Sequence, residues 1–186
     1  GTNWSTDAAG TTASVQTPTS GNLLFFSADS VTGSSPILTT VDSNYSVKGL
    51  RLRPSAATAV SIDTGLGGTL LLGDGGIQLA SGASPDLSIS VPLTLGAAQQ
   101  WQAGTPAALS VSGTVSGGVP MSPQAAPGSS IALTLSGPLT VAFGSALNDF
   151  TGDILVDGAT FVVDNLRDWG VPTIASTDSH TVMVNG

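Results

Sequence analysis

Short apolar runs return about every twenty residues along this chain. Within each run, apolar residues alternate with polar or small ones, which is the period-2 pattern of a β-strand with one buried face. Repeats of this length, each holding a strand or two and a turn, are typical of a solenoid whose coils are stable only when stacked. The main runs are Leu50/Leu52, Leu70–Leu72, Leu87–Val91, Leu109/Val111, Ile131–Leu135 and Ile154/Val156.

The alternation also predicts which side chains face the core. In Leu87–Val91 and Ile131–Leu135, we expect the Leu, Ile and Val side chains to point into one shared core. The residues between them should point away, namely Ser88, Ser90, Ala132 and Thr134. Turn residues separate the runs at Gly67-Gly68, Asp74-Gly75-Gly76, Gly117-Gly118, Gly137-Pro138 and Asp157-Gly158.

These patterns predict an all-β fold, a parallel β-helix of about six to eight coils. The alternative is a β-sandwich of hairpins, because Asp-Gly turns favour hairpins. We expect residues 1–46 to form an N-terminal lead-in with capping strands, and residues 47–186 to form the coils of one continuous domain.

The composition supports strands over helices. Charged residues make up only 9% of the 186 residues, and all 12 acidic residues are aspartate, whereas about a quarter of an ordinary domain is charged. The side chains that normally cover helix surfaces are therefore scarce. An apolar content of 40% is enough to bury a core and argues against disorder.

Charge and hydropathy exclude several classes of partner. The net charge of −8 leaves no basic stripe long enough for nucleic acid, and no apolar run approaches the ~20 residues of a membrane-spanning helix. There is no cysteine for a disulfide or a thiolate metal site. The chain starts at Gly1 without an initiator methionine, as a processed, exported protein would and as an artificial boundary also would.

One segment carries a resemblance to a known family. From Phe150 to Asn165 the order is aromatic-Thr-Gly, a short strand, glycine, a valine-rich strand and asparagine. Asp153 replaces a second glycine, and Ala159 separates the expected Gly-Thr pair. This segment resembles the autotransporter-associated β-strand repeat, and Asn3-Trp4-Ser5 is similar to a sequence that often opens such passenger regions.

The resemblance implies a right-handed β-helix that a bacterium exports as part of a larger surface or secreted protein. It implies no catalytic residues, because the family has none to carry over. The family's translocator barrel has no counterpart in these 186 residues.

Three of the four basic residues, Lys48, Arg51 and Arg53, lie close together. Arg51 and Arg53 share a strand face and are positioned to hold a uronate or the carboxylates of a partner. The interpretation we favour is a solvated strand face whose charges discourage edge pairing. No acidic cluster lies near them in the sequence to complete a lyase site.

Asp149, Asp153 and Asp157 recur every four residues and are the candidate metal ligands of the chain. Several carboxylates can bind calcium, and two can serve glycoside hydrolysis. Aspartates at turns also bond their own backbone, which is the interpretation we favour. We therefore expect no cofactor, with calcium as the alternative.

No catalytic residue is predicted. The sole histidine, His180, follows Asp178 and Ser179, and adjacent strand residues point to opposite faces instead of converging as a triad. The tryptophans could stack on sugars or fill the ends and corners of a solenoid, and we favour the second role. They are Trp4, Trp101 and Trp169.

The chain is thus expected to be a non-enzymatic extracellular structural protein on a bacterial surface, a subunit of a fibre, a surface layer or a passenger stalk. The alternative is a carbohydrate-binding or carbohydrate-active β-helix, with a glycan or cell-surface partner. Self-association through the solenoid ends is also expected, because exposed strand edges invite pairing. The candidate assembly residues are Trp4, Leu23, Leu24, Phe25, Phe26, Val182, Met183 and Val184.

Overall fold

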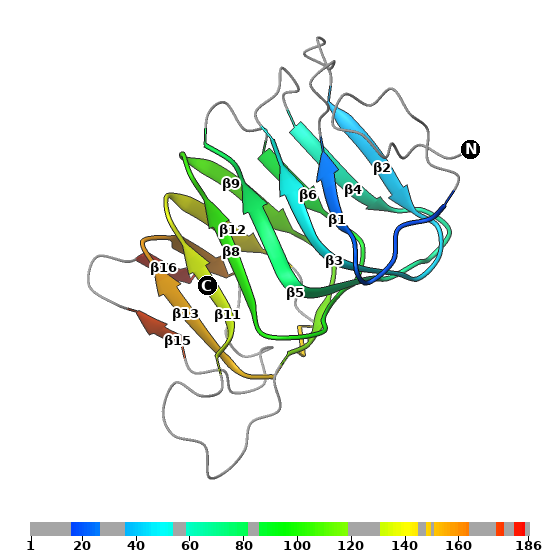
Figure 1. Ribbon diagram of the computed structural model, residues 1–186. Helices are drawn as coiled ribbons and strands as arrows, with labels where there is room; N and C mark the ends of the chain where they lie inside the picture. Colours follow the sequence, from blue (N-terminus) through cyan, green and yellow to red (C-terminus); the bar gives the residue numbers. More distant parts are fainter. Residues whose placement is uncertain are drawn as a thin grey trace.

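The computed structural model is a parallel β-helix that winds from the N-terminal to the C-terminal end of the chain (Figure 1). It describes residues 16–26, 36–53, 59–81, 86–118, 131–144, 148–149, 151–163, 174–176 and 181–184, with side chains up to residue 163. The described residues form strands and turns without a helix. The all-β prediction is therefore confirmed.

The described residues form sixteen strands, and every pairing between these strands is parallel. This excludes the β-sandwich of hairpins, because hairpin strands pair antiparallel. The strands are β1 (Leu23–Phe26), β2 (Ile37–Val41), β3 (Tyr45–Leu52), β4 (Ala59–Thr64), β5 (Leu70–Leu79), β6 (Asp86–Ile89), β7 (Leu93–Leu95), β8 (Gln99–Ala103), β9 (Ala107–Val111), β10 (Val115–Gly117), β11 (Ile131–Ser136), β12 (Leu139–Phe143), β13 (Asp153–Asp157), β14 (Thr160–Val163), β15 (Ile174–Ser176) and β16 (Thr181–Val184).

The strands form three walls around one core. Wall 2 contains seven strands in the order β1-β3-β5-β8-β11-β13-β15, and wall 3 contains seven in the order β2-β4-β6-β9-β12-β14-β16. Wall 1 is shorter, because only the first halves of β3 and β5 pair there with β7 and β10. Complete three-walled turns therefore number about four, and the prediction of six to eight coils is too high for such turns.

Glycine makes the corner between walls 1 and 2 in β5. The pairing with β3 shifts between Val47 and Gly49, so that three residues of β5, Gly73–Gly75, stand opposite the single residue Lys48 at this corner. Gly76 follows with a φ of 59°, and a Cβ built on it would collide with the carbonyl oxygen of Gln100. Only glycine combines this left-handed backbone with so close a neighbouring chain.

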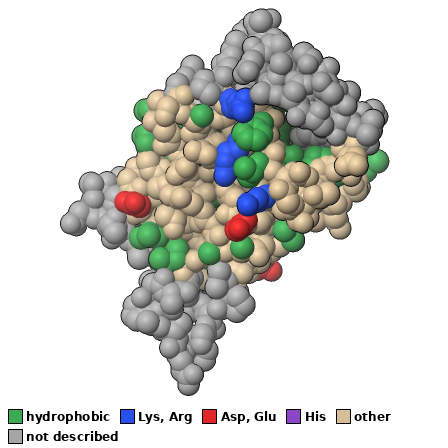
Figure 2. Space-filling model, viewed as in Figure 1, with side chains coloured by type: hydrophobic (Ala, Val, Ile, Leu, Met, Phe, Trp, Pro, Cys, Tyr) green, Lys and Arg blue, Asp and Glu red, His purple; other side chains and the backbone are tan. Residues whose placement is uncertain are grey.

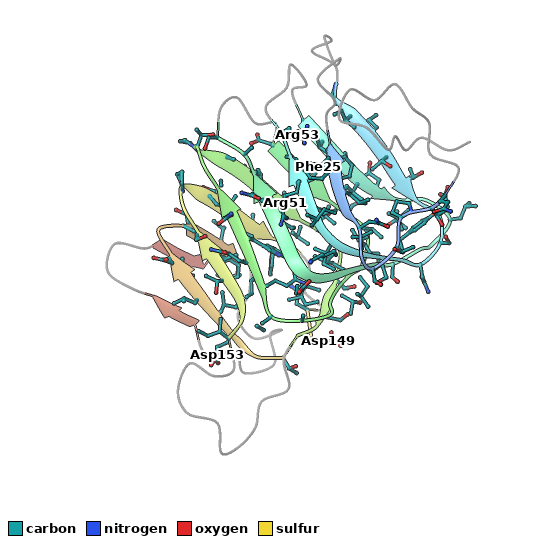
Figure 3. All side chains as sticks on the ribbon, viewed as in Figure 1. Phe25, Arg51, Arg53, Asp149 and Asp153 are labelled. Carbon is teal, nitrogen blue, oxygen red and sulfur yellow. The ribbon has the colours of Figure 1, made fainter. Side chains whose placement is uncertain are left out.

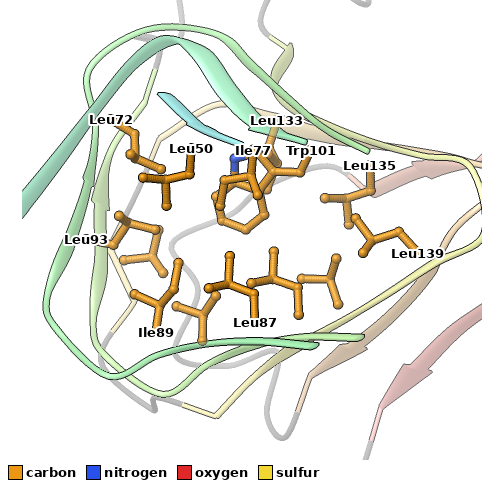
Figure 4. Packing of buried hydrophobic residues seen from close by; sticks show 14 of the residues in the cluster. Leu50, Leu72, Ile77, Leu87, Ile89, Leu93, Trp101, Leu133, Leu135 and Leu139 are labelled. Carbon is orange, nitrogen blue, oxygen red and sulfur yellow. The ribbon is translucent and has the colours of Figure 1, made fainter. Parts of the chain in front are cut away.

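The core is a continuous column of apolar side chains between the walls (Figure 4). Along wall 2, the inward positions of successive strands align as Leu24, Leu50, Ile77, Trp101, Leu135 and Val156. Each buried side chain thus packs on the equivalent side chain of the next coil, which is why one coil cannot be stable alone.

The predicted facing of strand residues is largely confirmed. Leu87, Ile89 and Leu133 are fully buried, whereas Ser88 is exposed and Thr134 is half-buried on the outer side. The prediction for Ala132 is wrong, because this residue is buried beside Leu133 and Ile131 is only half-buried. A register shift between Ile131 and Leu133 interrupts the alternation, as a β-bulge does.

The segment that resembles the autotransporter repeat forms consecutive strands of two walls. β13 lies in wall 2, β14 lies in wall 3, and Gly158 turns between them with a φ of 73°. The β-helix that the resemblance implies is present. The predicted division of the chain after residue 46 stays a prediction.

Candidate functional site

The described basic residues are Lys48 and Arg51 of β3 and Arg53, which directly follows that strand, near the N-terminal end of wall 2. In Figure 2 the Lys and Arg side chains form a row on one face, with hydrophobic side chains between them. We call Lys48, Arg51 and Arg53, together with Phe25 on the neighbouring β1, the basic stripe. Among the described residues, positive charge therefore lies on β3 and the residue after it, with the exposed Asp74 of the glycine corner opposite Lys48.

Phe25 lies between the two guanidinium groups of the stripe (Figure 3). It pairs in register with Arg51 on the outer face and is 50% exposed. The guanidinium carbon of Arg53 lies 4.7 Å from the centroid of the Phe25 ring. This is a cation–π contact, and it holds Arg53 against the aromatic ring.

Arg51 is held by the glycine corner of β5. Its Nη1 donates hydrogen bonds to the carbonyl oxygens of Leu50 at 2.9 Å and Gly76 at 3.4 Å, and Nη2 donates to that of Gly75 at 3.0 Å. These bonds tie the guanidinium to the backbone of β3 and of the glycine corner. Partial burial lowers the pKa of Arg51 from its ordinary value, because desolvation disfavours the cation. The group stays charged at neutral pH, since arginine starts from so high a value.

The outer face of wall 2 continues from the stripe as a ladder of uncharged polar groups. Arg51 is followed on successive strands by Gln78, Gln102 and Ser136. Gln100 lies two residues before Gln102 in β8, and its Nε2 donates a hydrogen bond to the Ser136 hydroxyl at 3.0 Å. Amide and hydroxyl groups thus cover the wall between the basic residues and Asp157 at its C-terminal part.

A cavity of ≈ 410 Å³ opens at the first coil, between β1 and β2. The inward side chains Leu24 and Phe26 line it, together with Val41, Leu50 and Ile62 of the first coils. Leu38, also in its lining, is 73% exposed. Of the predicted assembly run Leu23–Phe26, two residues therefore contribute to the open end of the core and Phe25 contributes to the stripe.

The candidate metal ligands do not come together. Asp149 is exposed after β12, while Asp153 and Asp157 stand at the two ends of β13. No His, Cys, Asp or Glu residues within the described ranges form a group of three or more that could hold a metal ion. A strand separates residues four apart by about 13 Å, which is too far for a shared ion.

Trp101 is a core residue, not a sugar platform. It is fully buried in β8, and its ring makes an edge contact with Phe143 at 5.7 Å between centroids. Its Nε1 donates to Oε1 of buried Gln99 at 2.9 Å, and Nε2 of Gln99 donates to the Leu72 carbonyl at 2.8 Å. Gln99 was not singled out from the sequence, where a glutamine beside polar Gln100 gives no sign of burial.

Several predicted residues lie outside the described ranges. These are Trp4, Trp169, Asp178, Ser179 and His180. Val182, Met183 and Val184 belong to β16, whose backbone pairs with β14, and their side chains are outside the description. The described part of the chain holds no helix long and apolar enough to cross a membrane.

Comparison with protein-family models, with curated proteins and with solved structures finds no match to this chain. The autotransporter resemblance therefore rests on the segment 150–165 and on the β-helix fold.

Proposed function

We propose that this chain is a non-enzymatic structural protein that assembles head to tail. Its setting would be the surface of a bacterium, as a subunit of a fibre, a surface layer or a passenger stalk. The observation that carries the proposal is that, among the described strands, both long walls end in strands that pair on one side only. β1 and β2 are the first strands of the walls, and β15 and β16 are the last.

An edge strand presents backbone N–H and C=O groups that a further strand can pair with. All pairings in the stack are parallel, so β16 of one copy would continue into β2 of the next as one more coil. Such a contact joins two different surfaces and propagates into a filament unless its rotation closes a ring.

The N-terminal end has features that favour a second copy as its partner. The cavity at the first coil is lined by core side chains, among them Leu24 and Phe26, that have a coil of described strands on one side only. The exposed Leu38 lies on β2, the edge strand of wall 3. A coil placed here would bury these apolar groups, which contributes roughly 25 cal/mol per Å² of area removed from water.

Deletion of residues 181–186, which removes β16, is expected to leave folded monomers. The last strand of wall 3 is then missing, whereas the buried core up to Val163 is kept. Light scattering and negative-stain electron microscopy measure the assembly state, and circular dichroism measures the fold. The intact chain should form filaments or ordered oligomers at the same concentration.

A second variant changes the N-terminal end of the solenoid without removing a strand. Leu38→Lys places a charge on the exposed side chain of edge strand β2, and lysine on an edge opposes strand addition. Fewer or shorter filaments are expected from it. Filaments that persist unchanged in both variants, or an intact chain that stays monomeric at every concentration, would refute head-to-tail pairing.

The non-enzymatic part of the proposal predicts no turnover. Incubation with pectins, glucans and mucin glycans, with and without calcium, should release no product that chromatography can detect. The physical reason is that the described carboxylates are dispersed and Arg51 is already bonded to backbone carbonyls. Product release that disappears in Arg51→Ala or Asp153→Ala would contradict this prediction.

A further inference from the structure

We propose that the basic stripe and the amide ladder beside it bind an acidic polysaccharide, a linear polyuronate. This inference goes beyond the structural function proposed above and does not depend on self-assembly. It concerns the outer face of wall 2, which the coil-to-coil pairing at the solenoid ends leaves uncovered.

The cations of the stripe lie in a line that suits a linear anion. Lys48 lies at the corner of β3, Arg51 lies in the second half of the strand, and Arg53 directly follows its last residue, so the three cations form the row seen in Figure 2. They are three of only four basic residues in a chain of net charge −8. A polyanion that approaches this protein is repelled by most of the surface and attracted at this strand.

The guanidinium groups are oriented before any ligand arrives. Three backbone carbonyls fix Arg51, and the Phe25 ring supports Arg53. The hydrogen bonds of Arg51 to these carbonyls use three of the five N–H donors of a guanidinium, which leaves two for a carboxylate. Oriented donors lose little conformational entropy on binding, so each carboxylate contact is stronger than one with a mobile side chain.

The neighbouring groups select a sugar acid over other anions. Gln78 and Gln102 continue the ladder from Arg51 on the next two strands, and Ser136 follows them. Amides both donate and accept hydrogen bonds, as sugar hydroxyls do, whereas phosphate oxygens only accept. Half-exposed Phe25 adds an apolar surface for a sugar ring. A polymer with alternating carboxylates and hydroxyls fits this combination.

Binding of polygalacturonate to the full chain, measured by isothermal titration calorimetry at low salt, tests the proposal. We expect saturable binding that weakens as salt rises, and no binding of fully methyl-esterified polygalacturonate, which lacks the charge. The double variant Arg51→Gln/Arg53→Gln should lose affinity by about tenfold or more, the scale of one or two charge-assisted hydrogen bonds. Asp157→Asn, at the far end of the same wall, is the matched control and should bind at least as well.

Arg51 also donates hydrogen bonds to the glycine corner, so replacing it can disturb the fold as well as the binding. A second variant therefore tests binding without changing the corner. Gln102→Glu puts a negative charge on an outward position of the ladder and should weaken polygalacturonate binding while the melting temperature stays unchanged. Equal affinity for the methyl ester, or affinity that survives in both folded variants, would overturn the proposal. Binding of single-stranded DNA or of phosphatidylserine vesicles as tightly as polygalacturonate would overturn the choice of a polyuronate.

Discussion

Leu133→Asp is expected to unfold the chain or to lower its free energy of unfolding by about 4 kcal/mol or more. Leu133 is fully buried in β11, where it pairs between Gln99 and Ile154 in the stacked core. An aspartate here would have no described cation to pair with, because the described basic residues lie on the outer side of β3 and directly after it. Thermal melting followed by circular dichroism measures the loss.

The neighbouring position provides the control. Thr134 lies on the outer side of the same strand and is only half-buried. Thr134→Asp should therefore lower the free energy of unfolding by no more than about 1 kcal/mol. If Leu133→Asp melts close to the unchanged chain, the one-sided core of wall 2 is wrong. Equal losses at both positions would mean that backbone pairing, and not core burial, determines the effect.

Trp101→Ala is expected to have the next largest effect. It should lower the free energy of unfolding by about 4 kcal/mol, because it removes a fully buried aromatic side chain and leaves a cavity. The ring reaches from wall 2 to Phe143 in wall 3, and Phe143 in turn contacts Phe161 at 5.3 Å between centroids. The substitution therefore loosens the contact between two walls. Chemical denaturation with urea measures the change in free energy.

Two further variants separate packing from hydrogen bonding at this position. Trp101→Phe keeps most of the apolar volume and removes the Nε1 donor to Gln99, so a smaller loss of about 1 to 3 kcal/mol is expected. Gln99→Leu leaves the indole N–H and the Leu72 carbonyl without this partner and should cost a similar amount. A Trp101→Phe loss as large as that of Trp101→Ala would show that the hydrogen bond, and not the ring, holds the walls.

The class of fold could be predicted because its cause is local. Strand faces follow from alternation, as in Leu87-Ser88-Ile89, and turns follow from residues such as Asp157-Gly158. Scarce charge and abundant apolar residues pointed to stacked strands with one buried side. The same local rule failed at Ala132, because a bulge is a property of two paired strands and not of one.

The number of complete turns could not be predicted from repeat spacing. Aligned core positions such as Leu50, Ile77 and Trp101 lie farther apart than the apparent repeat of about twenty residues. Some apolar runs belong to wall 1 and others to walls 2 and 3, so counting runs overestimates complete turns. The assignment of a run to a wall depends on corner residues such as Gly73–Gly75, which the repeat pattern does not distinguish.

By itself, the sequence determined that strands would stack with one apolar side, and that Lys48, Arg51 and Arg53 would lie together on one of them. Only the tertiary structure decided that Phe25 stands between the two arginines and that Gln78 and Gln102 extend their ladder. It also buried Trp101 with Gln99 and joined Gln99 to the Leu72 carbonyl of another coil. The physical reason is that neighbours within a strand follow from the chain, whereas neighbours between coils follow from register, which loops and corners of unequal length set.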